Sequence, residues 1–269
     1  MLKKLLKYDF IAVYRYWWIA ALVSFVLSLL GGGCMLIWDM EKELPSIVYV
    51  ITIFLFVLVF IGYIVFSILS AILLFARFYK NFFTDEGYLT FTLPVKRSTL
   101  LNSKLIVGIT TSLMTGFVIT FNVICMFCIG LGKYIFTPDF MDSIHNFIIQ
   151  LVTDIGWYLP IYIVELCIIS ILSIAFSTLL MFFCITFASI ITKKAKVITS
   201  IGIYFLINSI VSLMIQIFAI FGTSLFTEVL ESNAATSLLL LTILLFMAVF
   251  CTMFYTLEYW LIDRKLNLN

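Results

Sequence analysis

Long apolar stretches alternate with short polar stretches along the whole chain. A transmembrane helix needs about 20 consecutive apolar residues, and the sequence offers this length six times with few charged residues inside. We therefore predict an all-α integral membrane protein, a single domain covering 1–269 with six transmembrane helices. The predicted spans are approximately 16–38, 46–76, 105–132, 158–192, 197–222 and 235–260.

Composition supports the assignment to the membrane class. Of the 269 residues, 64% are hydrophobic and 11% are charged, whereas about a quarter of the residues in a soluble domain are charged. The 6 cysteines lie in apolar stretches, and the Cys125–Cys128 pair has neither a second pair nor a histidine to accompany it. We expect reduced, buried cysteines, no disulfide framework and no metal site.

The distribution of basic residues indicates an orientation. Lys and Arg concentrate in the first residues, in the connections after the second and fourth spans, and after the sixth span. The connections on the opposite side are acidic, and of the 16 basic residues they contain only Lys42 and Lys133. Short loops rich in Lys and Arg remain in the cytoplasm, so both termini of this multi-pass protein are predicted to be cytoplasmic.

Residues 1–15 are predicted to form an element separate from the first span. Apolar residues recur there at helical spacing from Leu2 to Val13, and three lysines occupy the other face. This pattern favours an amphipathic helix on the cytoplasmic leaflet; the alternative is a basic flank that only orients the first span. Near the outer end of that span, Gly31–Gly33 predicts close packing or a bend.

The connection 77–104, between the second and third spans, is the most polar segment of the chain. Thr84 is suited to cap a short helix whose first turn contains Asp85 and Glu86, and Pro94 would end it. Aromatic residues beside these acids would supply a contact surface for a soluble partner. An ordinary cytoplasmic loop, with its aromatic side chains on the lipid headgroups, is the other interpretation.

The phrase DEGYLTFTLP at 85–94, the ending KLNLN at 265–269 and the six-span pattern resemble the ABC-2 type permease subunit of a bacterial ABC exporter. Permeases that export phenol-soluble modulins or antimicrobial peptides are the most similar kind. The resemblance implies a homodimer with a second permease copy, two copies of a separate ATPase subunit, and a partly re-entrant outer segment at 222–234. It also implies that the 77–104 connection contains a coupling helix that contacts the ATPase through Phe82, Phe83, Thr84, Asp85, Glu86, Gly87 and Tyr88.

The sequence contains few residues that could carry out catalysis or bind a cofactor. No catalytic set or phosphate-binding loop occurs, so we expect no enzyme activity and no cofactor in this chain, with ATP and Mg bound by the partner. His145, the single histidine, is expected in a solvated external loop. Glu165, about ten residues into an apolar run, is a candidate for substrate contact or gating; the alternative places it at the outer interface. Glu258 is expected to anchor the inner end of the sixth span.

The predicted function is ATP-driven export of amphipathic, antimicrobial or toxin peptides across the bacterial cell membrane by alternating access, a function implied by the resemblance. The expected partners are the ATPase, the second copy, the lipid bilayer and the peptide substrate, with no nucleic acid. Two alternatives remain. One is a stand-alone secondary transporter or channel, and the other is an ABC exporter of lipid or drug substrates.

Overall fold

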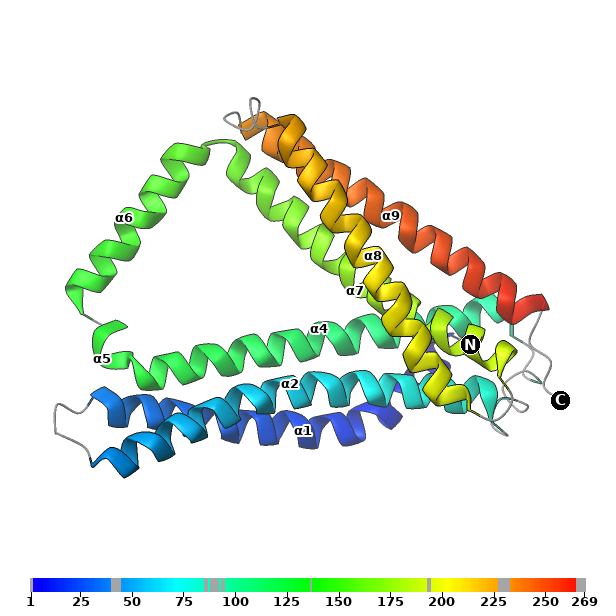
Figure 1. Ribbon diagram of the computed structural model, residues 1–269, viewed down its shortest axis with the longest axis horizontal. Coiled ribbons are helices and arrows are strands. Elements are labelled where there is room, and N and C mark those ends of the chain that lie inside the picture. Colours follow the sequence, from blue (N-terminus) through cyan, green and yellow to red (C-terminus); the bar gives the residue numbers. More distant parts are fainter. Residues whose placement is uncertain are drawn as a thin grey trace. The chain divides into compact units, whose positions relative to one another are not determined.

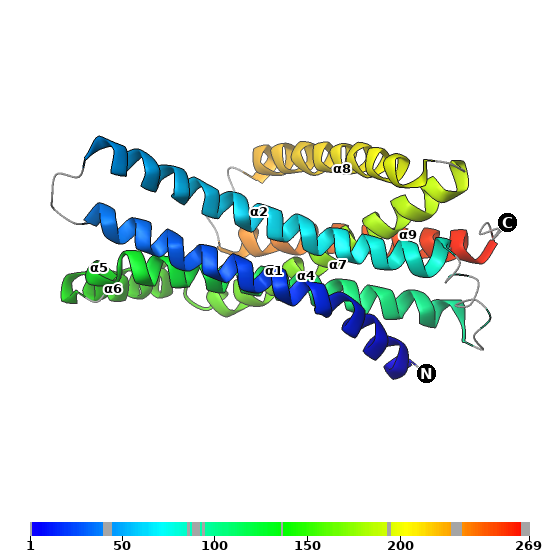
Figure 2. The same ribbon diagram turned by 90° about the horizontal axis from the view of Figure 1, so that it is seen from below.

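The computed structural model describes residues 2–39, 45–84, 87, 92, 95–135, 137–192, 195–226 and 233–264, and these ranges contain helices and short connections (Figures 1 and 2). The helices are α1 (Leu2–Asp39), α2 (Ser46–Phe83), α4 (Arg97–Gly130), α5 (Gly132–Ile135), α6 (Pro138–Ile155), α7 (Tyr158–Ile191), α8 (Lys196–Phe226) and α9 (Asn233–Arg264).

Within the described ranges, 6 helices are long and apolar enough to cross a membrane, and they fall where the sequence predicts them. They are α1, α2, α4, α7, α8 and α9. The prediction of an all-α protein with six apolar spans is confirmed at this level. The predicted re-entrant segment 222–234 is helical at both ends, in α8 and α9, while its central residues, 227–232, lie outside the described ranges.

The predicted connection 77–104 is much shorter in the structure. Helix α2 continues to Phe83 and α4 begins at Arg97, so the connection covers only 84–96. The length of an apolar run locates the bilayer crossing and not the end of the helix. Residues 77–83 contain neither Pro nor Gly, so helical hydrogen bonding continues past the apolar run.

The predicted boundary between an interfacial helix at 1–15 and a first span at 16–38 is absent, because α1 is one continuous helix of 38 residues. This stretch contains no proline, and its first glycine is Gly31. Without a helix breaker, a change from a basic to an apolar surface does not interrupt backbone hydrogen bonding.

The expected external loop after the third span is also largely helical. It contains the short α5 and the 18-residue α6, so His145 lies on a helix and not in a loop. Gly156 has a φ of +57° directly after α6, a left-handed conformation that commonly ends helices at glycine. Helix α7 then begins at Tyr158, where the fourth span was predicted.

The chain forms two compact units. One consists of 1–7, 75–109 and 154–269, and in it α7 packs against α8 and α9. The other consists of 8–74 and 110–153; α1, most of α2 and the second half of α4 lie side by side in it (Figures 1 and 2). A helix can contribute to both units because α2 and α4 are each longer than a membrane crossing requires.

Helices α1 and α4 pack in parallel along a polar and small-residue seam. The Trp17 indole donates to the Thr115 hydroxyl at 2.9 Å, and the Asn122 amide donates to the Ser24 hydroxyl at 2.9 Å. Each pair is separated by 98 positions, so the second contact lies seven residues further along both helices. This heptad spacing indicates parallel helices in left-handed packing.

The outer part of the same seam depends on glycine. A Cβ on Gly32 would lie 2.8 Å from the Ile129 Cβ and 3.1 Å from the Met126 carbonyl oxygen. Gly31 is similarly close to the Met126 side chain, whereas Gly33 has open space around it. The predicted close packing at Gly31–Gly33 is therefore confirmed for the first two of these glycines.

Candidate functional site

The chain turns tightly where α2 ends, at the start of the predicted partner contact. The Thr84 hydroxyl donates to the Lys80 carbonyl at 2.5 Å, and the Gly87 amide donates to the Thr84 carbonyl at 2.7 Å. A Cβ on Gly87 would lie 2.7 Å from the Phe82 carbonyl oxygen, too close for any other residue without a shift. The Thr84 side chain thus binds the last turn of α2.

Of the seven residues assigned to the partner contact, the structure describes four. Three others, Asp85, Glu86 and Tyr88, lie outside the described ranges, as does most of the predicted coupling helix. The described ones are Phe82, Phe83, Thr84 and Gly87.

The two phenylalanines before this turn have different environments. Phe82 is 0% exposed and stacks on Phe78 at 4.8 Å between ring centroids, and Phe78 stacks on Phe182 of α7 at 4.0 Å. Phe83 is partly exposed and packs at the edge of this cluster. Phe82 therefore anchors the end of α2 in the core, and the accessible aromatic surface here belongs to Phe83.

The start of α4 is attached to the end of α9. Nη1 of Arg97 donates to the Asp263 carbonyl at 2.5 Å, to the Asp263 carboxylate at 3.0 Å and to the Ile262 carbonyl at 3.3 Å. Carbonyls in the last turn of a helix lack intrahelical partners, so Arg97 caps α9 through space. One turn further along α4, the Tyr255 hydroxyl donates to the Asn102 amide oxygen at 2.8 Å.

The connection 84–96 is therefore held at both ends by side-chain contacts with the helices that follow it in the chain. The Phe78–Phe82 stack holds the α2 end against α7, and Arg97 holds the α4 end against α9. These contacts all lie within one compact unit, so a displacement of the connection would act on α7 and α9 directly.

Glu258 on α9 is fully buried, in contrast to the expectation of an interface anchor. Its Oε1 accepts a 2.6 Å hydrogen bond from the Thr186 hydroxyl on α7, and its Oε2 has no partner among the residues that the structure describes. An ionisable group inside a membrane helix is costly to bury and is usually functional. The prediction missed this site because sequence position does not show which face of α9 packs against α7.

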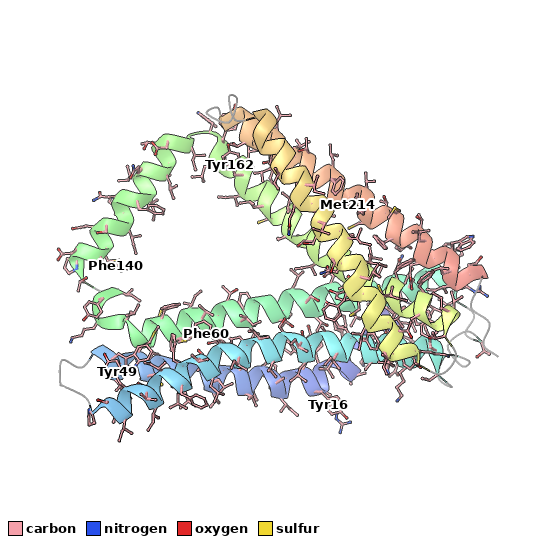
Figure 3. All side chains as sticks on the ribbon, in the orientation of Figure 1. Tyr16, Tyr49, Phe60, Phe140, Tyr162 and Met214 are labelled. Atoms are coloured by element: carbon pink, nitrogen blue, oxygen red, sulfur yellow. The ribbon has the colours of Figure 1, made fainter. Side chains whose placement is uncertain are left out.

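Glu165 is also buried, 8% exposed, and its Oε2 likewise lacks a partner in the described ranges. It lies in the third turn of α7, and the Tyr162 and Thr236 hydroxyls bind each other nearby, between α7 and α9. Figure 3 marks Tyr162 near the beginning of α7. The role of Glu165 in substrate contact or gating stays a prediction.

The two carboxylates lie at different depths. Thr186, the partner of Glu258, follows Glu165 by 21 residues on the same helix, a rise of about 32 Å. The hydrocarbon core of a bilayer is about 30 Å thick. Measured along α7, the two acids are therefore about one bilayer core apart, and they cannot both lie at its centre.

Other chemistry is sparse. Among the described residues, no group of three or more His, Cys, Asp or Glu side chains could hold a metal ion. His145 is exposed on α6. The chain was compared with protein-family models, with curated proteins and with solved structures, and none of the three comparisons found a match.

Proposed function

We propose that this chain is the membrane-spanning subunit of an ATP-driven exporter of the ABC-2 type, a permease that works with a separate ATPase. The polar connection 84–96 receives the ATPase on the cytoplasmic face, and both termini lie on that face. The substrate class is an amphipathic peptide. The proposal is supported by the phrase at 85–94 and by the alternation of basic and acidic connections.

The observation that carries the proposal is the double attachment of the connection. A loop that only joins two spans needs no fixed geometry, whereas a loop that transmits force needs rigid supports at both ends. Phe82 provides a buried support through the aromatic stack on α7, and Arg97 adds a solvent-exposed attachment to the end of α9.

A mechanism follows from these contacts. ATP binding closes the ATPase pair and displaces the connection of each permease copy. Because the supports at Phe82 and Arg97 are packed against α7 and α9, the displacement moves these helices at their cytoplasmic ends. The Thr186–Glu258 hydrogen bond joins the same two helices near that end, so it moves with them or breaks when they separate.

The experiment is co-purification of the chain with the ATPase encoded beside it, combined with measurement of ATP turnover. The test variants are Glu86→Arg and the pair Phe83→Ala with Tyr88→Ala. We expect both to lose the ATPase or its stimulation by the permease. Phe82→Ala is expected to act differently. It removes a fully buried ring and lowers the stability of the chain by about 3–5 kcal/mol.

The matched control is Asp142→Arg, the same change of charge as Glu86→Arg but on exposed α6, which the proposed orientation places on the other side of the membrane. It is expected to bind and stimulate the ATPase normally. If the wild type binds no ATPase, or if Glu86→Arg and the aromatic pair leave both readings unchanged, the assignment of the connection is wrong.

A second candidate, a stand-alone transporter, is favoured by the buried carboxylates of Glu165 and Glu258. Such transporters place their ion and substrate sites together near the middle of the bilayer, whereas these acids are separated by about the thickness of the bilayer core. Purified chain in vesicles without an ATPase distinguishes the candidates. Substrate movement that is abolished by Glu258→Gln would support the stand-alone transporter.

A further inference from the structure

Helix α6 has two chemically distinct faces and no buried side chain. Its apolar residues recur at helical spacing over the whole length of the helix. The stripe consists of Phe140, Met141, Ile144, Phe147, Ile148, Leu151, Val152 and Ile155, while Ile149 falls on the other face. Phe147 is 60% exposed and Ile148 is 51% exposed, and Figure 3 marks Phe140 near the start of the helix. A continuous apolar stripe of this kind is stable only when another apolar phase covers it.

We propose that α6 lies along the membrane surface, with this stripe inserted into the boundary between headgroups and acyl chains on the side opposite the basic connections. The occupant of the stripe is the lipid leaflet itself. The assignment of that side as the outer one rests on the proposed orientation of the chain; the insertion of the stripe does not depend on it.

The connections of α6 to its neighbours in the chain support lipid as the phase that covers the stripe. Helix α6 is joined through α5 to the end of α4 and through Gly156 to the start of α7. Both α4 and α7 have the length and hydropathy of membrane-crossing helices. The ends of α6 are therefore tethered at the same boundary of the bilayer, where the lipid is present at a high effective concentration.

The composition of α6 argues against a crossing, and α6 is not one of the helices that are long and apolar enough to cross a membrane. Its 18 residues extend about 27 Å, which is shorter than the bilayer core. Asp139, Asp142 and Asp154 would have to enter the hydrocarbon. A helix with one apolar face and one polar face lies in the plane of the interface instead. Trp157, 92% exposed directly after it, is a residue type that concentrates at this depth.

The charged residues of α6 indicate which kind of membrane surface it can bind. Its polar face contains three aspartates, one histidine and no Lys or Arg, so electrostatic attraction to anionic lipids does not contribute to binding. Insertion depends on the apolar stripe and is expected to be insensitive to salt. The basic start of α1 contains Lys3, Lys4 and Lys7. It would bind an anionic leaflet through its charge, so its binding is expected to weaken as the salt concentration rises.

The hinges on both sides allow this position. Gly132 and Gly156 have nothing within 4 Å of the place that a Cβ would take. Neither glycine is therefore retained for packing, and Gly156 adopts a left-handed φ that other residues avoid. Gly156 lies between α6 and α7, and Gly132 lies between α4 and the short α5 that leads to α6.

The test is photolabelling of the wild-type chain in nanodiscs that contain a phosphatidylcholine with a diazirine near the head of one acyl chain. Mass spectrometry locates the labels. We expect labels on Phe140, Phe147 and Leu151 and none on Asn146 or Gln150, at both low and high salt. We also expect His145 to react with diethyl pyrocarbonate from water. Nanodiscs expose both faces of the bilayer, so the labelling does not depend on the orientation of the chain. No ATPase is present, so a failure of this test is separate from a failure of the proposed function.

Two double variants provide the control, because they add the same charge to opposite faces. Phe147→Asp with Leu151→Asp is expected to reduce the labelling of Phe140 and Ile144 to background. Asn146→Asp with Gln150→Asp is expected to leave it unchanged. Labelling of the spanning helices shows in both cases that the chain is folded.

Three outcomes would overturn the proposal. The first is cross-linking between α6 helices of two copies without lipid labels, which would make the stripe a protein interface. The second is the absence of lipid labels together with rapid amide exchange over α6, which would place the helix in water. The third is lipid labelling that Phe147→Asp with Leu151→Asp does not change.

Discussion

At the scale of single residues, the buried acid Glu258 is the least expected feature of the chain. Its carboxylate is enclosed between α7 and α9, and a single side-chain hydrogen bond, from Thr186, reaches it among the described residues. A buried carboxylate with one unpartnered oxygen costs free energy. The proposed mechanism offers a reason for this cost, because it requires α7 and α9 to move at the end where Glu258 lies.

Removal of the Thr186 hydroxyl tests the energetic role of this pair. Thr186→Val keeps the shape of the side chain but leaves the Glu258 carboxylate without its donor. We expect the free energy of unfolding to fall by about 1–3 kcal/mol, measured by titration with a denaturing detergent. In Thr252→Val, the control on α9, the lost hydroxyl is exposed and binds only its own helix. An equal loss in both variants would contradict a special role for Glu258.

At the scale of elements, the α1–α4 seam shows how helices associate where lipid removes the hydrophobic driving force. Hydrogen bonds at Trp17–Thr115 and Ser24–Asn122 lie one heptad apart, and Gly32 allows close approach further along. Interhelical hydrogen bonds in membranes contribute only about 0.6 kcal/mol on average. Close packing around the glycines is therefore expected to contribute as much as the polar pairs.

The two adjacent glycines Gly32 and Gly33 provide a matched test of this packing. Gly32→Ala places a methyl group 2.8 Å from the Ile129 Cβ and is expected to destabilise the chain by about 1–3 kcal/mol through overpacking. Gly33→Ala meets open space and is expected to stabilise it by about 0.5–1 kcal/mol, because alanine favours a helix. Detergent titration measures both, and the reverse order would show that α1 and α4 do not pack along this seam.

At the scale of the whole molecule, the proposed orientation rests on the charges of the connections. Short segments rich in Lys and Arg stay in the cytoplasm, and acidic segments alternate with them along the chain. The six candidate spans return the chain to the side on which it started. This even number agrees with the charge pattern, although the two come from independent properties of the sequence.

Reporter fusions test this orientation. Alkaline phosphatase, which is active only outside the cytoplasm, is expected to be active after residue 145 and inactive after residues 90 and 195. Green fluorescent protein, fused after the same three residues, should give the opposite pattern. An active phosphatase after residue 90 would reverse the orientation, and the connection 84–96 could not then meet a cytoplasmic ATPase.

The sequence alone determined the class of the protein, the positions of the six apolar spans and the alternation of charge. These properties depend on local composition, and the thickness of the bilayer sets how long an apolar stretch must be to cross it. The phrase at 85–94 likewise supplied the hypothesis about function. The amphipathic period of 138–155 was present too, and a search for helical period in addition to apolar length would have found α6.

Only the tertiary structure decided which faces of the helices meet. Phe82 and Phe83 are neighbours of the same type, yet one is buried and the other is partly exposed. Glu258 is a core residue because α9 turns that face toward Thr186, and Arg97 caps the end of α9 through Asp263, 166 positions away. In a chain whose helices are apolar on nearly every side, hydrophobicity does not distinguish lipid-facing from helix-facing residues. The distinction comes from side-chain size and hydrogen bonding between distant segments.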